Sequence, residues 1–378
     1  MVRALARVNL AAIERNAARM SRELQPGVVL CAVVKADGYG HGAVPAARAA
    51  LAGGAGWLAV ATAAEAAELR EAGIEARILV MGALSVEEVP VALAADADVV
   101  AWSESFASHL AAAAAAAGRP TRVHVKLDTG MGRLGTRVPP EAIAVAELIY
   151  AEPSLELAGA MTHFATADDD PEFMAAQLAR FEPFAAELRR LLPGIVVHAA
   201  NSAAVLNEPA SHFDLVRCGI ALYGLDPMNE SAAARVLEPA LELTSYVAAV
   251  KAAARGDSAG YGRLFVSDRE TWLATLPIGY ADGIRRAFTN NLDVLIGGRR
   301  HPVVGAVSMD NITVEIARTR ADAEIIEAGA RATIIGADGQ ERQSAEDLAA
   351  RIATINYEIV CGISGRVPRA YHRDGVPM

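Results

Sequence analysis

The sequence predicts a (β/α)8 barrel followed by a mainly β domain, and three observations favour this fold class. Over the first two-thirds of the chain, eight short runs rich in Val, Ile and Leu alternate with longer segments of helical spacing. The runs are apolar along their whole length, which is typical of parallel strands covered on both faces. Near residue 235 the alternation stops, and strands broken by Gly, Pro and Asn follow. A doubly wound open sheet is the rival, but eight strands favour the barrel. The expected domains are 1–235 and 236–378.

The first domain begins at residues 1–20, whose apolar stretch is interrupted by Asn9, Glu14 and Arg15, so that an amphipathic helix is expected there. The eight predicted strands occupy residues 28–35, 57–62, 77–82, 98–102, 122–128, 156–164, 195–201 and 215–224. The helices predicted between them occupy residues 63–72, 85–95, 103–118, 140–151 and 172–191.

The second domain begins with a long strand and a Gly-marked turn within residues 237–262. Further strands are predicted within residues 271–283, 292–298, 301–316 and 331–336. One late helix is expected over 344–359, because Ser344 and Asp347 have the spacing of a capping box.

Composition excludes several classes of protein. The chain has 378 residues, of which 53% are hydrophobic, which is enough for a large core and argues against disorder. The formal net charge of -10 argues against a nucleic-acid partner. Cys31, Cys218 and Cys361 are few and widely spaced, as in a protein of a reducing compartment. No apolar run approaches the roughly 18 residues of a membrane span, and no cluster has metal-ligand spacing. We therefore expect a soluble cytoplasmic protein without a metal site.

Polar residues gather where the predicted barrel strands end, which is the end that carries function in this fold. They are Lys35, Lys126, Asp128, Arg133, Thr162, His163, Asn201, Ser202, Arg217 and Tyr223, and Gly219 lies among those of the last strand. Lys35 is the sharpest signal, because an ammonium group after an apolar strand is costly unless it is paired or its amine is used. Burial lowers a lysine pKa and makes attachment to a carbonyl cofactor feasible. A lysine that merely extends to solvent is the alternative.

A phosphate group is expected at Asn201-Ser202 and at Cys218-Gly219-Ile220, after the last two strands. Barrels commonly bind phosphate there through backbone N–H groups. The alternative makes Ser202 an ordinary helix N-cap and Gly219 a turn residue, which would not exclude phosphate binding. His163 could be a base, a supporting donor or a core histidine. Tyr261 lies between two glycines, from which a tight turn can present its ring.

Nine segments, taken in order from residue 31 to 371, resemble bacterial alanine racemases. They are AVVKADGYGHG, KLDTGMGRLG, MTHFATAD, HAANSAA, VRCGIALYG, AGYGRLF, LPIGYADG, VSMDNITV and YEIVCGISGRVPRAY. The resemblance implies a pyridoxal-phosphate barrel followed by a β domain, working as a homodimer with shared active sites. It also implies interconversion of L- and D-alanine, with D-alanine supplied for peptidoglycan.

The resemblance assigns roles to matching positions. Lys35 matches the lysine that holds pyridoxal phosphate, and Tyr261 matches a catalytic tyrosine that reaches in from the partner subunit. Arg217 matches the arginine that faces the pyridine nitrogen, and His163 matches a histidine linking this arginine to the tyrosine. The positions that match phosphate-binding residues are Tyr39, Ser202, Gly219, Ile220 and Tyr357.

Three further positions match residues around the substrate. Arg133 and Met309 match residues that meet the substrate carboxylate, and Lys126 matches a lysine that is often carbamylated and orients the arginine. Two positions depart from the family pattern: Ser308 stands where Cys is common, and Gly38 where Ala is common. The first departure could alter the wall of the substrate pocket.

Removing a proton from one face of the substrate and returning one to the other requires an acid/base group on each side. The resemblance gives these roles to Lys35 and Tyr261. A racemase of broader or serine specificity is the nearest rival. Arg217 argues against a decarboxylase on the same barrel, because those enzymes usually place an acidic residue there. The β domain with Tyr261 and Met309 argues against a non-catalytic cofactor carrier, and the strand ends show no hydrolase triad.

Overall fold

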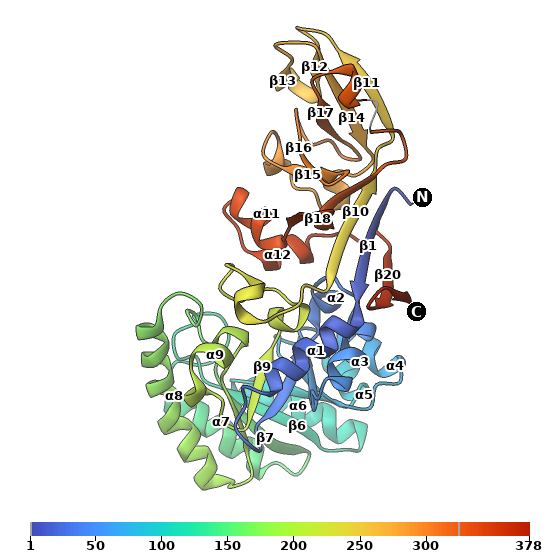
Figure 1. The fold of residues 1–378 in the computed structure, drawn as a ribbon. Helices are drawn as coiled ribbons and strands as arrows, with labels where there is room; N and C mark the ends of the chain where they lie inside the picture. Colours follow the sequence, from blue (N-terminus) through green and yellow to red (C-terminus); the bar gives the residue numbers. More distant parts are fainter. Residues whose placement is uncertain (1, 324–325) are drawn as a thin grey trace. The chain divides into compact units, whose positions relative to one another are not determined.

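The computed structural model describes residues 2–323 and 326–378, and its chain divides into two compact units. The barrel unit comprises Ile13–Met228 and Ala232–Glu238. The β unit comprises the chain up to Ala12, Asn229–Ser231 and Pro239–Met378. Figure 1 shows the barrel unit in blue to yellow, and most of the β unit in yellow to red. Among the described residues no helix is long and apolar enough to span a bilayer.

The barrel unit contains one sheet of eight parallel strands in the order β8-β7-β6-β5-β4-β3-β2-β9. The sheet closes between its end strands, where the N–H of Asp214 donates to Val197 O (3.0 Å) and the N–H of Arg217 donates to Ala200 O (2.9 Å). All eight predicted strands are present, so the barrel is confirmed. Their bounds are β2 (Val29–Val33), β3 (Trp57–Val60), β4 (Arg77–Val80), β5 (Ala97–Ala101), β6 (Thr121–Lys126), β7 (Leu155–Met161), β8 (Val196–His198) and β9 (Leu215–Cys218).

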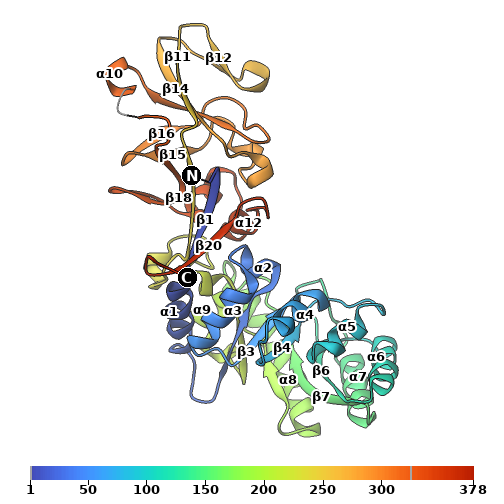
Figure 2. The same ribbon diagram turned by 90° about the vertical axis from the view of Figure 1, so that its right-hand side faces the viewer.

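Helices cover the outside of the barrel (Figure 2), and several of them start at a capping residue of the sequence. Thr62 and Glu65 form a complete capping box, while Ser103 and Asp170 each accept a backbone N–H three residues on. The five predicted helices are all found. The helices of this unit are α1 (Leu10–Ser21, which begins in the β unit), α2 (Lys35–Tyr39), α3 (Ala43–Ala52), α4 (Ala63–Glu71), α5 (Val89–Ala94), α6 (Glu104–Ala117), α7 (Pro139–Ala151), α8 (Pro171–Leu191) and α9 (Ser202–Asn207).

The β unit is built on an eight-stranded sheet, in which the path β16-β15-β18-β10-β1-β20-β21 is joined by β19 on β18. A three-stranded sheet, β11-β14-β17, and the hairpin β12-β13 complete it. The strands are β1 (Ala4–Asn9), β10 (Leu241–Tyr246), β11 (Ala249–Ala253), β12 (Ser258–Ala259), β13 (Phe265–Val266), β14 (Thr271–Leu276), β15 (Asp293–Ile296), β16 (Arg299–Pro302), β17 (Ile312–Ala317), β18 (Arg331–Asp338), β19 (Glu341–Gln343), β20 (Arg369–Arg373) and β21 (Val376–Pro377). The helices are α10 (Arg320–Ala323), α11 (Ala345–Arg351) and α12 (Asn356–Cys361).

Three expectations about local structure are wrong in part. Residues 4–9 form a strand rather than the first turns of a helix, because alternate residues Ala4, Ala6 and Val8 are buried between β10 and β20. The structure therefore groups these residues with the β unit, in contrast to the expected domain 1–235.

The long strand expected at 237–262 is divided into β10 and β11, which belong to different sheets. The helix expected over 344–359 does begin at the Ser344 capping box, but it stops at Arg351, and α12 starts at Asn356. Between the two helices Ala353 adopts φ +54°, a left-handed conformation that no α-helix can accommodate.

Candidate active site

Lys35 lies at the carboxyl end of a barrel strand, one residue beyond the buried Val34 that follows β2. The next four residues, 36–39, all adopt left-handed backbone conformations, with φ between +53° and +60°. Such a conformation costs roughly 1–2 kcal/mol for each residue that is not glycine. The surrounding structure must therefore hold this turn in place.

Two carboxylates hold the left-handed turn. Glu65, in the first turn of α4, accepts the N–H of Ala36 at 2.7 Å with one oxygen and the N–H of Ala61 at 2.7 Å with the other. Asp37 accepts the N–H of Ala43 at 2.9 Å, which joins the turn to the start of α3. The backbone that presents Lys35 is thus fixed to two helices of the barrel unit.

The predicted phosphate site forms a small cradle of buried groups at the ends of β8 and β9. Ser202 Oγ accepts the N–H of Gly219 at 2.9 Å. A Cβ on Gly219 would lie 2.4 Å from the hydroxyl oxygen of Tyr39, so only glycine leaves room for that hydroxyl. Ile220 begins a buried 3-10 turn, and its N–H has no acceptor among the described residues. The cradle therefore brings together one backbone donor and two hydroxyl groups, which are groups of the kind that bind phosphate.

The N-cap of α9 is Asn201 rather than Ser202, because the Asn201 side chain accepts the N–H of Ala204 at 3.0 Å. The interpretation of Ser202 as an ordinary N-cap is therefore wrong. Its hydroxyl group is not used to cap the helix and turns to Gly219 instead.

Arg217 is almost completely buried, and four acceptors hold its guanidinium group. One Nη atom lies 2.8 Å from His198 Nδ1, and the other donates to Thr162 O and Ala199 O, both at 2.9 Å. The second Nη atom also lies 3.2 Å from His163 Nδ1. Burial lowers the pKa of Arg217 to about 10, so the group remains charged at neutral pH. Burial, and after it the positive charge of Arg217, also holds the pKa of His163 well below its usual value.

The loop after β6 is organised by the buried carboxylate of Asp128. Its oxygens accept the N–H groups of Gly130 and Gly132, all at 3.0 Å, and the guanidinium group of Arg137 at 3.1 Å. This loop exposes Arg133 to solvent, while Lys126 is buried on the strand itself. Burial, followed by the charges of Arg217 and Arg133, lowers the pKa of Lys126 to about 8.

Three predicted residues belong to the β unit. Tyr261 begins a short 3-10 turn and has 76% of its surface exposed. Gly260 before it adopts φ +73°, and a Cβ there would lie 2.9 Å from Ala306 N, so the turn packs closely on the chain at 305–306. Tyr357 lies half-buried in α12.

Met309 is half exposed, in a loop that pairs with the segment after β14. The N–H of Tyr280 donates to Ser308 O and that of Ala281 to Met309 O, each at 3.0 Å. No described residue accepts from the N–H of Met309, which leaves this donor for a ligand.

Sequence reasoning missed the residues that support Arg217 from below. His198, His124 and Asp98 form a connected chain of hydrogen bonds that begins at Arg217. The signal in the sequence was a histidine within an otherwise apolar strand run, in VHVK for His124 and in IVVHAA for His198.

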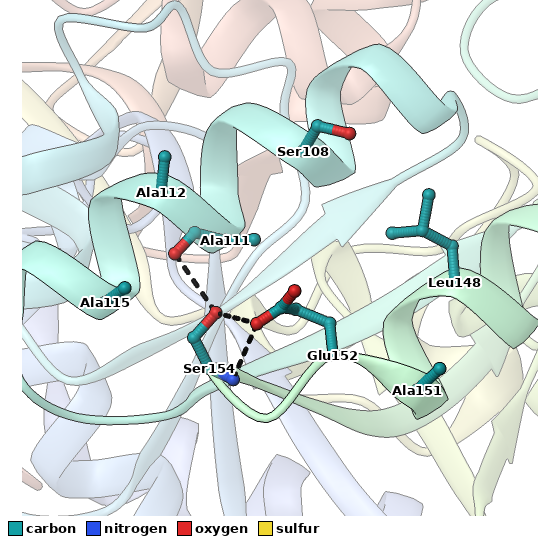
Figure 3. Close-up of a pocket in the computed structure, with 8 residues that line it drawn as sticks. All are labelled: Ser108, Ala111, Ala112, Ala115, Leu148, Ala151, Glu152 and Ser154. Atoms are coloured by element: carbon teal, nitrogen blue, oxygen red, sulfur yellow. Dashed lines mark hydrogen bonds between the residues drawn. The ribbon is translucent and has the colours of Figure 1, made fainter.

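A pocket of about 580 Å³ lies on the outside of the barrel between α6 and α7 (Figure 3). None of the predicted site residues lines it. Its polar side chains bond to their own surroundings, since Ser154 Oγ donates to Glu152 (2.8 Å) and lies 3.1 Å from Ala111 O. Small side chains form most of its wall, so it offers little chemistry.

Comparison with known proteins covers nearly the whole chain. Residues 8–227 match the family of the alanine racemase N-terminal domain, and residues 240–371 match that of the alanine racemase C-terminal domain. An alanine racemase of Desulfovibrio desulfuricans is 40% identical over 369 residues, which is 97% of each chain. The crystal structure of alanine racemase from Streptomyces lavendulae has a TM-score of 0.92 at 38% identity, covering 98% of this chain and 97% of that one. The structure from Bacillus anthracis with bound L-Ala-P has a TM-score of 0.91 at 36% identity, covering 100% and 97%.

Proposed function

The chain belongs to the alanine racemase family of pyridoxal-phosphate-dependent isomerases, and we propose that Lys35 and Tyr261 of the partner subunit serve opposite faces of alanine. The observation that carries this proposal is Lys35 itself. A fixed left-handed turn presents this amine at the carboxyl end of a barrel strand, within a chain of which 97% matches an alanine racemase. By the family resemblance, the D-alanine product would serve peptidoglycan synthesis. The few, widely spaced cysteines support a location in the reducing cytoplasm.

The residues present fit pyridoxal phosphate. The Tyr39 and Ser202 hydroxyl groups and the N–H of Ile220 would hold its phosphate, and Tyr357 is proposed to join them. Lys35 would hold the cofactor covalently. When bound, the cofactor withdraws electrons from the α-carbon of the attached amino acid and so acidifies the α-proton.

Arg217 would face the ring nitrogen of the cofactor. Its guanidinium group has only donors and stays charged at neutral pH, so it would donate to that nitrogen and prevent a proton from binding there. A ring that stays unprotonated is a weaker electron sink, which limits side reactions such as transamination.

His163 connects Arg217 to the second acid/base group. Because Arg217 only donates, His163 Nδ1 must accept, and a neutral His163 then carries its proton on Nε2. That N–H can donate to the oxygen of Tyr261 and stabilise the phenolate form. A free tyrosine has a pKa of about 10, so a base at neutral pH needs such help.

Lys126 is proposed to carry a carbamate. Formation of a carbamate requires the neutral amine, and the lowered pKa of about 8 makes that form accessible. The positive charges of Arg217 and Arg133 contribute to the lowered pKa of Lys126. A negatively charged carbamate on Lys126 would attract these two guanidinium groups, whereas an ammonium group repels them. Arg133 and the N–H of Met309 would meet the substrate carboxylate.

A homodimer would complete each site with Tyr261 of the partner subunit. In the single chain Tyr261 is exposed, and so are the apolar side chains of Leu264 and Val266 on the same hairpin segment. Exposed apolar side chains beside a residue that would act in the active site of another subunit are typical of an interface between subunits.

Chiral analysis of the products from purified protein and each L-amino acid tests the activity. We expect D-alanine from L-alanine, whereas preferential turnover of serine would assign the broader racemase. Borohydride reduction followed by peptide mapping should place the pyridoxyl group on Lys35, and a label on another lysine would overturn that assignment.

Inactive Lys35→Ala and Tyr261→Ala chains, once mixed, should regain activity as heterodimers. No recovery after proven subunit exchange would refute the shared site.

A further inference from the structure

A continuous chain of hydrogen bonds runs through the interior of the barrel, from Arg217 to the opposite end. His198 Nδ1 lies 2.8 Å from Arg217, and His198 Nε2 lies 2.8 Å from His124 Nδ1. His124 Nε2 in turn lies 3.0 Å from Asp98 Oδ2. All four side chains are buried, so water does not interrupt the chain.

The chemistry of the end groups leaves only one arrangement of protons. A guanidinium group has donors and no acceptor, so His198 Nδ1 must accept from Arg217. The pKa of His198 is held well below its usual value by burial and by Arg217, so the ring is neutral and its proton lies on Nε2. His124 Nδ1 must then accept, and His124 Nε2–H donates to Asp98. Every bond therefore points from the arginine toward the carboxylate.

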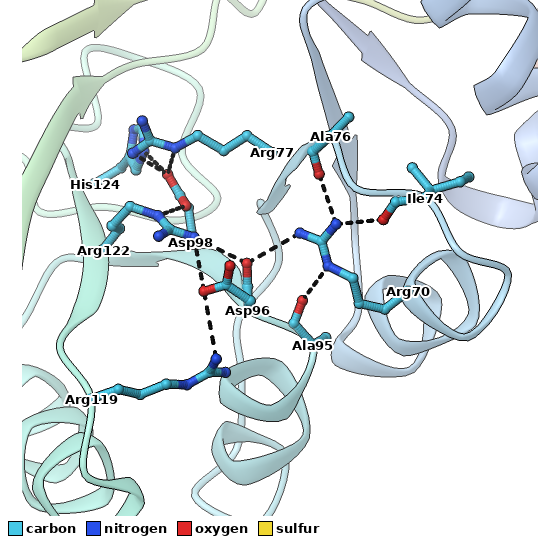
Figure 4. A network of polar contacts seen from close by, with 10 residues as sticks. All are labelled: Arg70, Ile74, Ala76, Arg77, Ala95, Asp96, Asp98, Arg119, Arg122 and His124. Carbon is cyan, nitrogen blue, oxygen red and sulfur yellow. Dashed lines mark hydrogen bonds and ion pairs between the residues drawn. The ribbon is translucent and has the colours of Figure 1, made fainter.

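Asp98 is firmly ionised at the far end of this chain. It lies near the start of β5, where Arg77 and Arg122 on the neighbouring strands pair with it at 2.7 Å and 2.6 Å (Figure 4). Burial by itself would raise the pKa of Asp98, but hydrogen bonds from His124 and both arginines outweigh it and lower the pKa to about 2.

The strands make specific room for His124. A Cβ on Gly159 would lie 1.9 Å from His124 Nδ1, so only glycine fits at that position of β7. The register between β6 and β7 also shifts at His124, and the Trp57 ring packs edge-on against the imidazole at 5.9 Å. A histidine that only fills the core needs neither hydrogen-bond partners on both of its ring nitrogens nor a glycine beside it.

We propose that Asp98, His124 and His198 act as positioning residues for Arg217, holding its guanidinium group in place through two neutral imidazoles. Within the barrel unit no described carboxylate pairs with Arg217 directly, and Asp98 is the acidic group to which its hydrogen bonds lead. This chain of hydrogen bonds from Arg217 through His198 and His124 to Asp98, which we call the relay, keeps the guanidinium group fixed where it would face the ring nitrogen. This role rests on the proposed contact between Arg217 and the cofactor, whereas the proton arrangement does not.

The proton arrangement is testable in the protein without cofactor. In protein labelled with 15N at histidine, the long-range 1H–15N pattern should show both His124 and His198 neutral and protonated on Nε2 at pH 7. A proton on Nδ1 of His198, or a charged imidazole, would overturn the relay. This measurement stands even if the protein does not racemise alanine.

A matched pair of variants tests the consequence for Arg217. His124→Phe keeps a ring of similar size but breaks the chain, whereas His124→Gln keeps one acceptor and one donor. In the loaded enzyme we expect His124→Phe to show a changed cofactor absorption spectrum and roughly 10- to 100-fold slower racemisation, the loss typical of outer partners at metal sites. The ratio of transamination to racemisation should rise as well. His124→Gln should restore most of the spectrum and the ratio.

Thermal unfolding shows whether His124→Phe is folded, and this separates a positioning role for His124 from a purely structural one. If His124→Phe folds, binds the cofactor and keeps the wild-type spectrum and product ratio, the positioning role is wrong. Should His124→Phe not fold, Asp98→Asn takes its place as the variant that weakens the chain. His124→Gln remains the variant that keeps the chain. Gly194→Ala is the control, since no atom lies within 4 Å of an added Cβ there, and it should match the wild type.

Discussion

Replacing Gly219 with alanine should weaken cofactor binding, because the new methyl group would collide with Tyr39. Its carbon would lie 2.4 Å from the Tyr39 hydroxyl oxygen and 2.9 Å from the ring carbon that bears it. The Tyr39 ring cannot simply retreat, because the Tyr223 ring lies 5.0 Å away and is anchored by a 3.0 Å hydrogen bond to Val33 O.

The size of the effect follows from the cost of overpacking. Adding a methyl group to a closely packed site typically costs about 1–3 kcal/mol. If Tyr39 must leave the position from which it reaches the phosphate, this cost appears as a cofactor Kd raised about 5- to 150-fold, at 1.4 kcal/mol per factor of ten. Any part of the strain that persists in the apoenzyme appears instead as a lower Tm.

Titration of the apoenzyme with pyridoxal phosphate, followed by absorbance, measures this Kd. The Tyr39→Phe background removes the atom that the methyl group meets first, so Gly219→Ala should cost less there than in the wild type. Gly194→Ala should leave the Kd unchanged. An unaltered Kd in Gly219→Ala, together with an unaltered Tm, would refute the steric argument and the cradle built on it.

Three other predictions concern protons. For Lys126, 13C-bicarbonate should give a carbamate signal that grows as the pH rises through about 8 and is missing from Lys126→Ala; a signal appearing only near the ordinary lysine value of 10.5 would contradict the lowered pKa. For Asp98, whose pKa falls from 3.8 to about 2 on folding, the carboxylate stabilises the fold above pH 3.8 and loses this effect as the pH falls through about 2. The contribution is about 2 kcal/mol, so melts of wild type and Asp98→Asn should converge over that window, and a constant difference would exclude this linkage. For Tyr261→Phe in deuterated water, exchange from D-alanine should persist while exchange from L-alanine and racemisation fall by about 10²–10⁴-fold; equal losses from both isomers would defeat the assignment to two faces.

The barrel was predictable because its strands are buried on both faces and therefore appear as unbroken apolar runs. The strand at residues 4–9 was not, because its partners β10 and β20 lie more than two hundred residues away in the sequence. Its short alternation of small and polar residues runs directly into a helix, and local pattern alone does not separate the two. Tertiary pairing decided this segment.

The site divides in the same way. Lys35, Ser202 and Arg217 were recognisable because polar groups at strand ends stand out against apolar runs. The relay behind Arg217 was hidden, since His124 and His198 are separated by 74 residues and meet only when β6, β7 and β8 pair. A single histidine inside a strand looks like an ordinary core residue until its neighbours across the barrel are known.

The position of β1 in its sheet sets an order in which the nascent chain can fold. This strand lies between β10 and β20, antiparallel to the first and parallel to the second. During synthesis β1 emerges before the barrel strands, whereas its second partner, Arg369–Arg373, emerges after them. The barrel strands, all made in between, can pair before the sheet of the β unit is complete. Contacts so distant in sequence slow folding, because long loops must close first. Removing residues 4–9 should therefore disrupt the β unit rather than the barrel unit.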